Sequence, residues 1–221
     1  LEADRKIRPG EYELNPAMAP ADILSKLTAG RVVLHAVTIP EGYTMAQIAD
    51  VLAQHQITDR AEFLRLAKDK SFIKTLGVSA ETLEGYLYPD TYRFPKPVSA
   101  KEVIRTMVEQ LNQVVTPEWQ ARAKDIHLTL HQVLTLASVI EKETASGEER
   151  PQISSVFHNR LRQKIPLQSD PTVIYGLPNF DGNLHKKDLS HPSPCNTYRW
   201  AGLPPGPIAN PGLASLEAVA N

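Results

Sequence analysis

Extended and helical patterns alternate in the first half of the chain and predict a small module of strands and helices. Extended apolar segments at residues 12–14 and 37–39 each lead into a turn. Ile and Leu then recur at helical spacing, at residues 21–27 and 46–52. The two copies form a weak internal repeat in which each amphipathic helix packs on its strand. A further helix is expected at residues 61–68.

Polar residues mark where several helices begin. A Ser or Thr followed three residues later by Glu or Gln is a capping box, in which each side chain accepts a hydrogen bond from the other residue's backbone. The predicted pairs are Thr44 with Gln47, Ser99 with Glu102, and Thr129 with Gln132. Thr116-Pro117 is another helix start, because proline is tolerated at the first helical position. From residue 99 onward the pattern is mostly helical.

Residues 84–95 interrupt this periodicity and are dense in Tyr, Pro and Gly. We interpret them as a hinge that ends a small α+β module, residues 1–95, before a mostly helical domain with short strands, residues 96–221. The predicted fold class is therefore α+β. The chain begins without Met and stops inside an expected helix at residues 217–221, so we expect the second domain to be truncated at its C-terminus.

The composition narrows the classes of function. The 221 residues are 42% hydrophobic and 22% charged, which is typical of a globular protein. A net charge of -1 without a long Lys or Arg run argues against nucleic acid as a partner. Cys195 is the only cysteine, so no internal disulfide can form. No stretch approaches the roughly 18 apolar residues of a membrane span, and we expect no signal peptide within these residues.

One glutamate falls on the apolar face of a predicted helix. At about 100° per residue, the helix from Leu130 places Glu141 inside its apolar stripe, with Lys142 opposite and Glu143 at the edge. A buried carboxylate is costly unless paired or functional, because burial disfavours its ionised form. A carboxylic acid that keeps its proton is what general acid catalysis needs. The alternative is a salt-bridged or half-exposed residue at the helix end.

Several short motifs occur in a fixed order along the chain. They are residues 40–44 (PEGYT), 84–92 (EGYLYPDTY), 137–144 (ASVIEKET), 155–161 (SVFHNRL), 167–176 (LQSDPTVIYG), 196–198 (NTY) and 202–212 (GLPPGPIANPG). Together they resemble the endolytic murein transglycosylase family, the YceG-like proteins, over nearly the whole chain. In that family the first Glu of the Glu-Lys-Glu motif is catalytic, which corresponds to Glu141. The family's small module is described as LysM-like, which matches residues 37–52.

The resemblance implies cleavage of the β-1,4 bond from N-acetylmuramic acid to N-acetylglucosamine in peptidoglycan. Glu141 would protonate the glycosidic oxygen and then, as a base, take the proton of the muramic C6 hydroxyl as it attacks C1. Because this nucleophile belongs to the substrate, one protein carboxylate suffices, unlike the two of ordinary glycosidases. The product would carry a 1,6-anhydro ring, and no metal or cofactor is expected.

Other residues in the motifs are candidates for binding the sugar chain. Polar side chains offer hydrogen bonds to hydroxyl and acetamido groups, and tyrosines could stack on pyranose faces. The candidates are Gln168, Asp170, Thr172, Asn196, Tyr198, Glu143, Tyr88, Tyr92 and Tyr175. Each has a structural alternative: Asp170-Pro171-Thr172 is also a helix start, and tyrosines near a hinge often only pack. Cys195 stands where the family usually has Tyr, which implies either that a stacking contact is missing there or that Cys195 is an engineered or local variant.

Other functions remain open on the sequence. A hydrolytic muramidase would use water as nucleophile and Asp170 or Glu143 as a second carboxylate. A non-catalytic peptidoglycan-binding module would rest on the LysM-like part alone. His127 and His131 are four residues apart, but Leu128 stands where a metalloprotease has Glu, so we expect no metal. Nothing supports the aminodeoxychorismate lyase label that the family has also carried.

The family resemblance also implies a location and partners. It places this domain outside the inner (cytoplasmic) membrane, on the periplasmic side, tethered by a single N-terminal helix that is absent from these residues. The expected partners are peptidoglycan glycan strands and the penicillin-binding proteins that synthesise them. The implied role is to terminate nascent strands.

Overall fold

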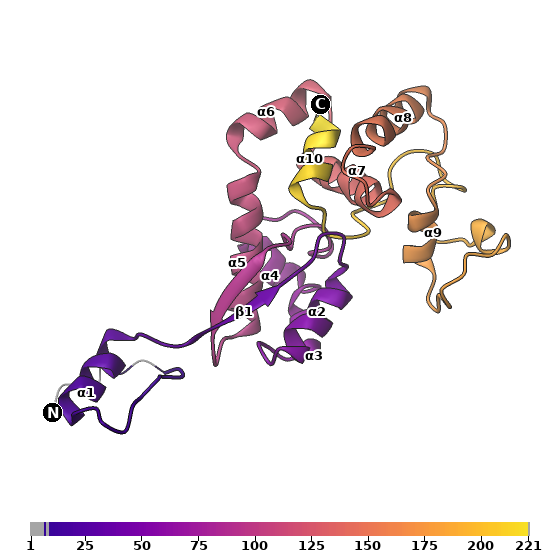
Figure 1. The fold of residues 1–221 in the computed structure, drawn as a ribbon. Helices are drawn as coiled ribbons and strands as arrows, with labels where there is room; N and C mark the ends of the chain where they lie inside the picture. The colour runs from indigo at the N-terminus through magenta and orange to yellow at the C-terminus, as the bar shows by residue number, and fades with distance from the viewer. Residues whose placement is uncertain (1–6, 8, 221) are drawn as a thin grey trace.

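The computed structural model describes residue 7 and residues 9–220, which form helices and one small sheet (Figure 1). The strands are β1, Leu34–Thr38, and β2, Thr91–Pro95. The helices are α1, Pro20–Ala29; α2, Met45–Gln54; α3, Arg60–Leu66; α4, Lys70–Thr75; α5, Ala100–Val114; α6, Pro117–Asp125; α7, Leu130–Glu143; α8, Arg150–Gln163; α9, Asp170–Gly176; the short 3-10 helix η2, Asp188–Ser190; and α10, Leu213–Ala220. The expected α+β class is confirmed.

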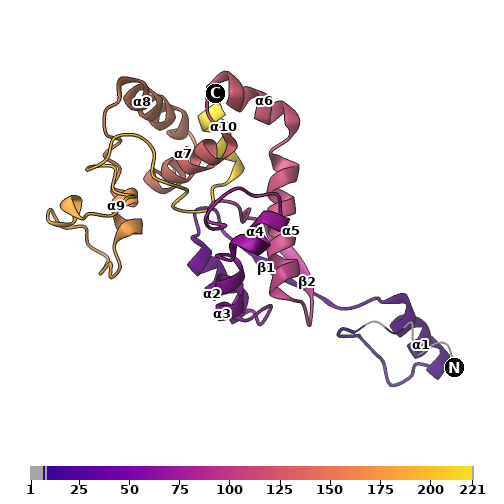
Figure 2. The same cartoon turned by 180° about the vertical axis from the view of Figure 1, so that it is seen from behind.

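The sheet joins two segments that the sequence pattern does not connect. Strands β1 and β2 are antiparallel, with Val37 opposite Tyr92, and lie side by side (Figure 2). Tyr92 and Phe94 are buried while their neighbours in β2 point outward, as expected when one strand face is covered. Interpreting residues 91–95 as part of an irregular hinge was therefore wrong, because flanking Pro and Gly obscured a short alternation. The domain boundary after residue 95 stays a prediction.

Only the second copy of the expected repeat folds as a unit. Residues 12–14 carry no assigned strand, and α1 has no buried residue. Figure 1 shows α1 standing apart from the rest, at the end of an extended segment. In the second copy, β1 leads into α2, and Ile48 and Leu52 of α2 are fully buried. An amphipathic pattern therefore predicted both helices, but only the second buries its apolar side chains.

The three predicted capping boxes are present. In α7, Thr129 Oγ1 accepts from the Gln132 N–H at 3.2 Å, and Gln132 Oε1 accepts from the Thr129 N–H at 2.9 Å. The boxes of α2 and α5 have the same reciprocal arrangement. Helix α6 starts at Pro117, directly after its cap Thr116. These starts were predictable because each depends on residues only three positions apart.

Helix α7 is the centre of the second half. All of its residues from 133 to 140 are buried, and α6, α8, α9 and α10 contact it. The short strands expected here are absent from the described residues 96–220. Prolines recur between residues 166 and 211, and proline has no N–H to donate to a strand ladder. Among the described helices, none is long and apolar enough to cross a membrane.

Candidate active site

Glu141 lies in the last turn of α7, where its side chain is only 6% exposed. The residues before it are buried, whereas Lys142 and Glu143 are exposed. The sheltered position that the helical pattern predicted for Glu141 is confirmed. The position brings a carboxyl group to the point where α7 meets α8 and the C-terminal segment.

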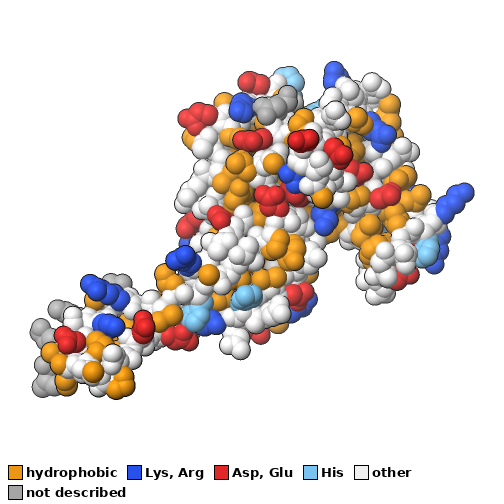
Figure 3. Space-filling model, viewed as in Figure 1, with side chains coloured by type: hydrophobic (Ala, Val, Ile, Leu, Met, Phe, Trp, Pro, Cys, Tyr) orange, Lys and Arg blue, Asp and Glu red, His pale blue; other side chains and the backbone are white. Residues whose placement is uncertain are grey.

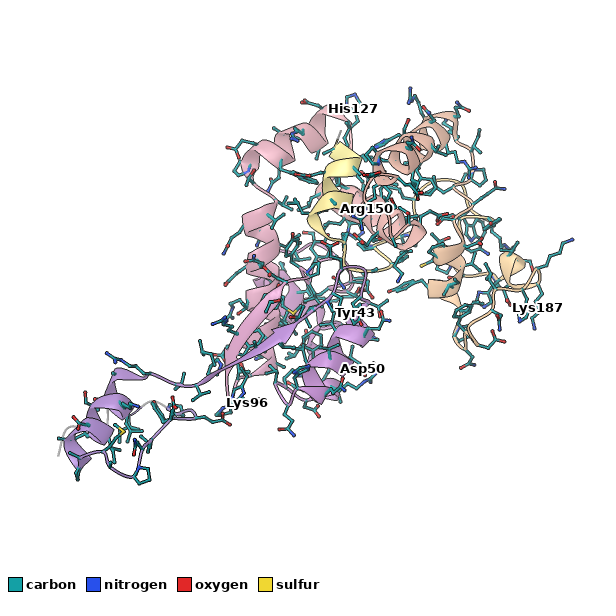
Figure 4. All side chains as sticks on the ribbon, viewed as in Figure 1. Tyr43, Asp50, Lys96, His127, Arg150 and Lys187 are labelled. Atoms are coloured by element: carbon teal, nitrogen blue, oxygen red, sulfur yellow. The ribbon has the colours of Figure 1, made fainter. Side chains whose placement is uncertain are left out.

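Three hydrogen-bond donors converge on the Glu141 carboxylate. Arg150 Nη2 donates to Oε1 at 2.9 Å, while the Gly212 N–H and Ser215 Oγ donate to Oε2 at 3.1 and 2.7 Å. Figure 4 shows Arg150 within the group of helices in the second half of the chain. The surroundings of the carboxylate are therefore polar, and the expectation that its neighbours are aliphatic was wrong. Periodicity places a residue on a helix face, but it does not show what other elements bring there.

The donors come from two separate parts of the chain, the start of α8 and the segment at the start of α10. Arg150 begins α8 and is buried, with 8% exposure. The preceding turn is fixed by the Thr144 hydroxyl, which donates to Glu149 Oε2 at 2.7 Å. Ser215 lies in α10, which packs against both α7 and α8. The site therefore depends on the fold of the whole second half.

A second carboxylate approaches the same guanidinium group. Glu41 follows β1, and its Oε2 lies 3.9 Å from Arg150 Nη2, with the side chain 50% exposed. Gly212 faces the Glu41 carboxylate so closely that a β-carbon would overlap it. Desolvation and the nearby negative charge of Glu141 raise the pKa of Glu41, and Arg150 partly opposes this. The first half of the chain thus contributes an acidic group beside Glu141.

Glu84 forms a buried junction between the two halves. Its Oε1 accepts from the Met45 N–H and from Asn210 Nδ2, both at 2.9 Å, and its Oε2 accepts from the Tyr175 hydroxyl at 3.1 Å. Burial raises the pKa of Glu84 to about 7, although these hydrogen bonds act in the opposite direction. The junction fixes α9 and the C-terminal segment against the start of α2.

Cavities lie on both sides of the contact between Glu84 and Tyr175. The larger has a volume of about 780 Å³, and Lys68, Lys142 and Ile174 contribute to its wall. The smaller, of about 440 Å³, is lined by His131 among others. Both volumes fall in the range of small-molecule sites. The larger cavity borders the last turn of α7 through Lys142, although Glu141 itself does not line it. In the view of Figure 3, acidic and basic side chains lie close together in the main body of the molecule.

Four of the predicted binding residues lie near the end of α7. Asp170 Oδ1 accepts from the Tyr198 hydroxyl at 2.6 Å, and Glu143 Oε2 accepts from Ser169 Oγ at 2.7 Å. The hydrogen bond to Asp170 is the largest cause that raises the pKa of Tyr198 to about 12. Gln168, beside this group, is exposed. Gln168, Asp170, Tyr198 and Glu143 thus form a polar group open to solvent.

Thr172 and Asn196 are fully buried and use their polar atoms within the protein. The Thr172 hydroxyl donates to the Ser169 carbonyl at 2.6 Å. Asn196 Nδ2 donates to the carbonyls of Leu189 and His191 at 3.0 and 2.8 Å. In this structure both residues shape the loops around α9 and do not face an open surface.

The tyrosines differ in what they can offer a sugar. Tyr88 is 9% exposed, and Tyr92 is buried and stacked on Phe94 at a centroid distance of 5.8 Å. Tyr175 is 39% exposed and is the member of this group whose ring reaches a cavity on either side. Half-buried Cys195 lines the smaller cavity beside it, and burial raises the pKa of its thiol.

His131, which was considered as a zinc ligand with His127, makes contacts within the protein. Its Nδ1 lies 2.8 Å from the Tyr86 hydroxyl, and its Nε2 lies 3.0 Å from the Pro205 carbonyl. The rings of His131 and Tyr86 stack with their centroids 6.0 Å apart. His131 thereby joins the start of α7 to two loops.

Comparison with known proteins identifies the family of this chain. The family model described as the YceG-like family matches residues 1–221, the whole chain. The chain belongs to the YceG-like family. The resemblance inferred from the ordered motifs is thus confirmed.

Curated relatives and a solved structure support the assignment of this chain to the YceG-like family. A protein of Bacillus subtilis named endolytic murein transglycosylase is 37% identical over 225 residues, which cover 95% of this chain and 62% of the relative. A Streptococcus pneumoniae protein of the same name is 32% identical over 247 residues, covering 97% of this chain and 44% of the relative. A crystal structure of a YceG-like protein from Listeria monocytogenes matches with a TM-score of 0.78 and 37% identity, covering 98% of this chain and 77% of that one. The chain spans 62% and 44% of the two curated relatives.

The sequence reasoning missed four residues around the YceG-like site. Glu41 and Gly212 lie within the motifs at residues 40–44 and 202–212, so the resemblance contained a signal for them. Arg150 and Ser215 had no such signal. Arg150 follows Glu141 by nine residues in another helix, a separation that no helical periodicity connects.

Proposed function

We propose that this chain is the catalytic part of an endolytic lytic transglycosylase that cleaves the β-1,4 bond between N-acetylmuramic acid and N-acetylglucosamine in peptidoglycan strands. The names of the curated relatives support this activity. The single observation that carries it is Glu141, a sheltered carboxyl group held by three converging donors at the end of α7. A general acid and base must be fixed in this way to meet a bound substrate.

In the proposed mechanism Glu141 first donates a proton to the glycosidic oxygen as the bond to C1 breaks. The donors Arg150, Gly212 and Ser215 then stabilise the carboxylate that remains, because hydrogen bonds to a charged acceptor are stronger than those to a neutral one. In the second step this carboxylate accepts the proton of the muramic C6 hydroxyl as its oxygen bonds to C1. The protons balance, the product carries a 1,6-anhydro ring, and the chain's own residues suffice.

The sugar chain is proposed to lie along the end of α7. The larger cavity offers apolar surface with Lys68 and Lys142 at its wall, and Tyr175 supplies a partly exposed ring beside it. Asp170 and Tyr198 offer acceptors and donors on the neighbouring surface. A carbohydrate requires this combination of stacking faces and hydrogen-bonding groups.

The finer features of the family are proposals as well. We infer that the segment containing β1 and α2 acts as a LysM-like glycan-binding element. We also infer that the domain works outside the cytoplasmic membrane, anchored there by an N-terminal helix. It would terminate nascent strands beside penicillin-binding proteins. These inferences rest on the resemblance and on the names of the relatives.

Digestion of purified peptidoglycan followed by mass analysis of the released fragments tests the reaction. Transglycosylation yields anhydro ends that are one water lighter than hydrolysed reducing ends. Anhydro ends are expected. Reducing ends would favour the muramidase alternative, and binding without any release would favour a non-catalytic module.

A further inference from the structure

The carboxylate of Glu41 lies near the Arg150 guanidinium group that binds Glu141, and it has no part in the mechanism proposed above. The same nitrogen, Arg150 Nη2, is 2.9 Å from Glu141 Oε1 and 3.9 Å from Glu41 Oε2. Glu141 is enclosed, whereas the Glu41 side chain is half exposed. One arginine therefore serves two acids, and one of them opens to solvent.

Close backbone contacts keep Glu41 in this position. Gly212 donates its N–H to Glu141 and turns its α-carbon toward the Glu41 carboxylate, leaving no room for a β-carbon. Gly42 lies against the Glu141 side chain, where an added β-carbon would stand 3.4 Å from Cγ. The Gly42 N–H donates to the Asn210 carbonyl at 2.9 Å. Two glycines thus allow the loop after β1 to approach α7 closely.

Around Glu41 and Glu141, the negative charges of the two carboxylates outnumber the single positive charge of Arg150. Two carboxylates face one guanidinium group, so full ionisation would leave an excess negative charge in a partly desolvated place. Lys142 is a further cation that contacts the loop after β1, and its Nζ donates to the Gly42 carbonyl at 3.3 Å. Tyr88 lies within electrostatic reach of both Glu41 and Glu217 of α10. Burial and the neighbouring charge of Glu141 raise the pKa of Glu41, because a like-charged neighbour disfavours the loss of a proton.

We propose that Glu41 is a positioning residue of the active site, which together with Arg150 keeps Glu141 supplied with the proton that it donates. The proposal rests on the function proposed above. The two acids hold one proton between them, and Arg150 balances the remaining negative charge. The proton passes through Glu141 to the glycosidic oxygen, and the proton of the C6 hydroxyl restores it. The first half of the chain would then complete the catalytic site.

The pH dependence of the cleavage rate tests this role. In Glu41→Gln the neighbouring negative charge is gone, so the alkaline limb of the profile should move about one pH unit lower. The rate near neutral pH should fall roughly tenfold and recover in acid. Glu41→Asp keeps the charge and should retain most of the profile. Glu148→Gln, which removes an exposed carboxylate two residues before Arg150 in the chain, is the matched control and should leave the profile unchanged.

Two results would overturn the proposal: an unshifted profile in Glu41→Gln, or a loss of rate that is uniform at every pH. Thermal unfolding of each variant identifies a folding defect, and Glu41→Ala, with the same expected shift, replaces Glu41→Gln if the latter does not fold. Glu141→Gln is measured alongside. If Glu141→Gln keeps its activity, the proposed function itself fails. If it is inactive while the Glu41 variants keep the wild-type profile, only the role of Glu41 fails.

Discussion

Replacing Arg150 by Met tests whether its guanidinium group is what makes a sheltered carboxylate tolerable at position 141. The side chains of Arg150 and Glu141 are 10% and 6% exposed, with 2.9 Å between the paired atoms. Removing one partner of a buried ion pair costs about 3–5 kcal/mol, because the other charge stays buried without compensation. At about 2–4 °C per kcal/mol for a chain of this size, the Tm of Arg150→Met should fall by roughly 6–20 °C.

Thermal unfolding followed by circular dichroism measures this effect. Arg65→Met is the matched control, since Arg65 is 58% exposed and its pair with Glu62 is a surface pair. Such pairs contribute less than about 1 kcal/mol. The double variant Arg150→Met/Glu141→Gln should recover part of the lost Tm, because no charge remains buried. An Arg150→Met protein that melts together with Arg65→Met would refute the reasoning.

Three further predictions concern stability and rate. The pKa of Glu84 is raised from 4.5 to about 7 in the folded protein. The stability that this shift contributes below pH 4.5 is therefore lost as the pH rises to about 7, by up to about 3 kcal/mol. In urea unfolding, the free energy of unfolding of Glu84→Gln should depend less on pH than that of the wild type. Gly85 has a φ of +84° and its α-carbon faces the Pro207 ring, so Gly85→Ala should lower the free energy of unfolding by at least about 2 kcal/mol; an unchanged urea midpoint would contradict this. Ser215→Ala removes the 2.7 Å donor to Glu141 and should lower kcat about tenfold with little change in KM; a change in KM alone would assign Ser215 to binding.

The helices, and the helix face on which Glu141 lies, were predictable because they depend on residues that are close together in the sequence. The capping box of Thr129 and Gln132 joins residues three positions apart, and the apolar stripe of α7 repeats within each turn. The pairing of β1 with β2 was not predictable in this way. It joins Val37 to Tyr92 across a long separation, and the composition around β2 suggested a hinge.

In the candidate site, too, the residues that could be predicted are those that depend on neighbours close in the sequence. Glu141 could be selected from one helix, whereas Arg150, Gly212 and Ser215 reach it only through tertiary packing. A motif also does not distinguish a residue that faces substrate from one that holds a loop. Thr172 shares a motif with Asp170, yet it is fully buried while Asp170 is exposed.

The rate at which Glu141→Gln releases soluble muropeptides tests the central claim most directly. Wild type and Glu148→Gln serve as references, and circular dichroism establishes that each protein is folded. Loss of a general acid lowers the rate by about a hundredfold or more, so Glu141→Gln should release almost no fragments while Glu148→Gln matches wild type. A folded Glu141→Gln protein that releases anhydro fragments at the wild-type rate would contradict the account.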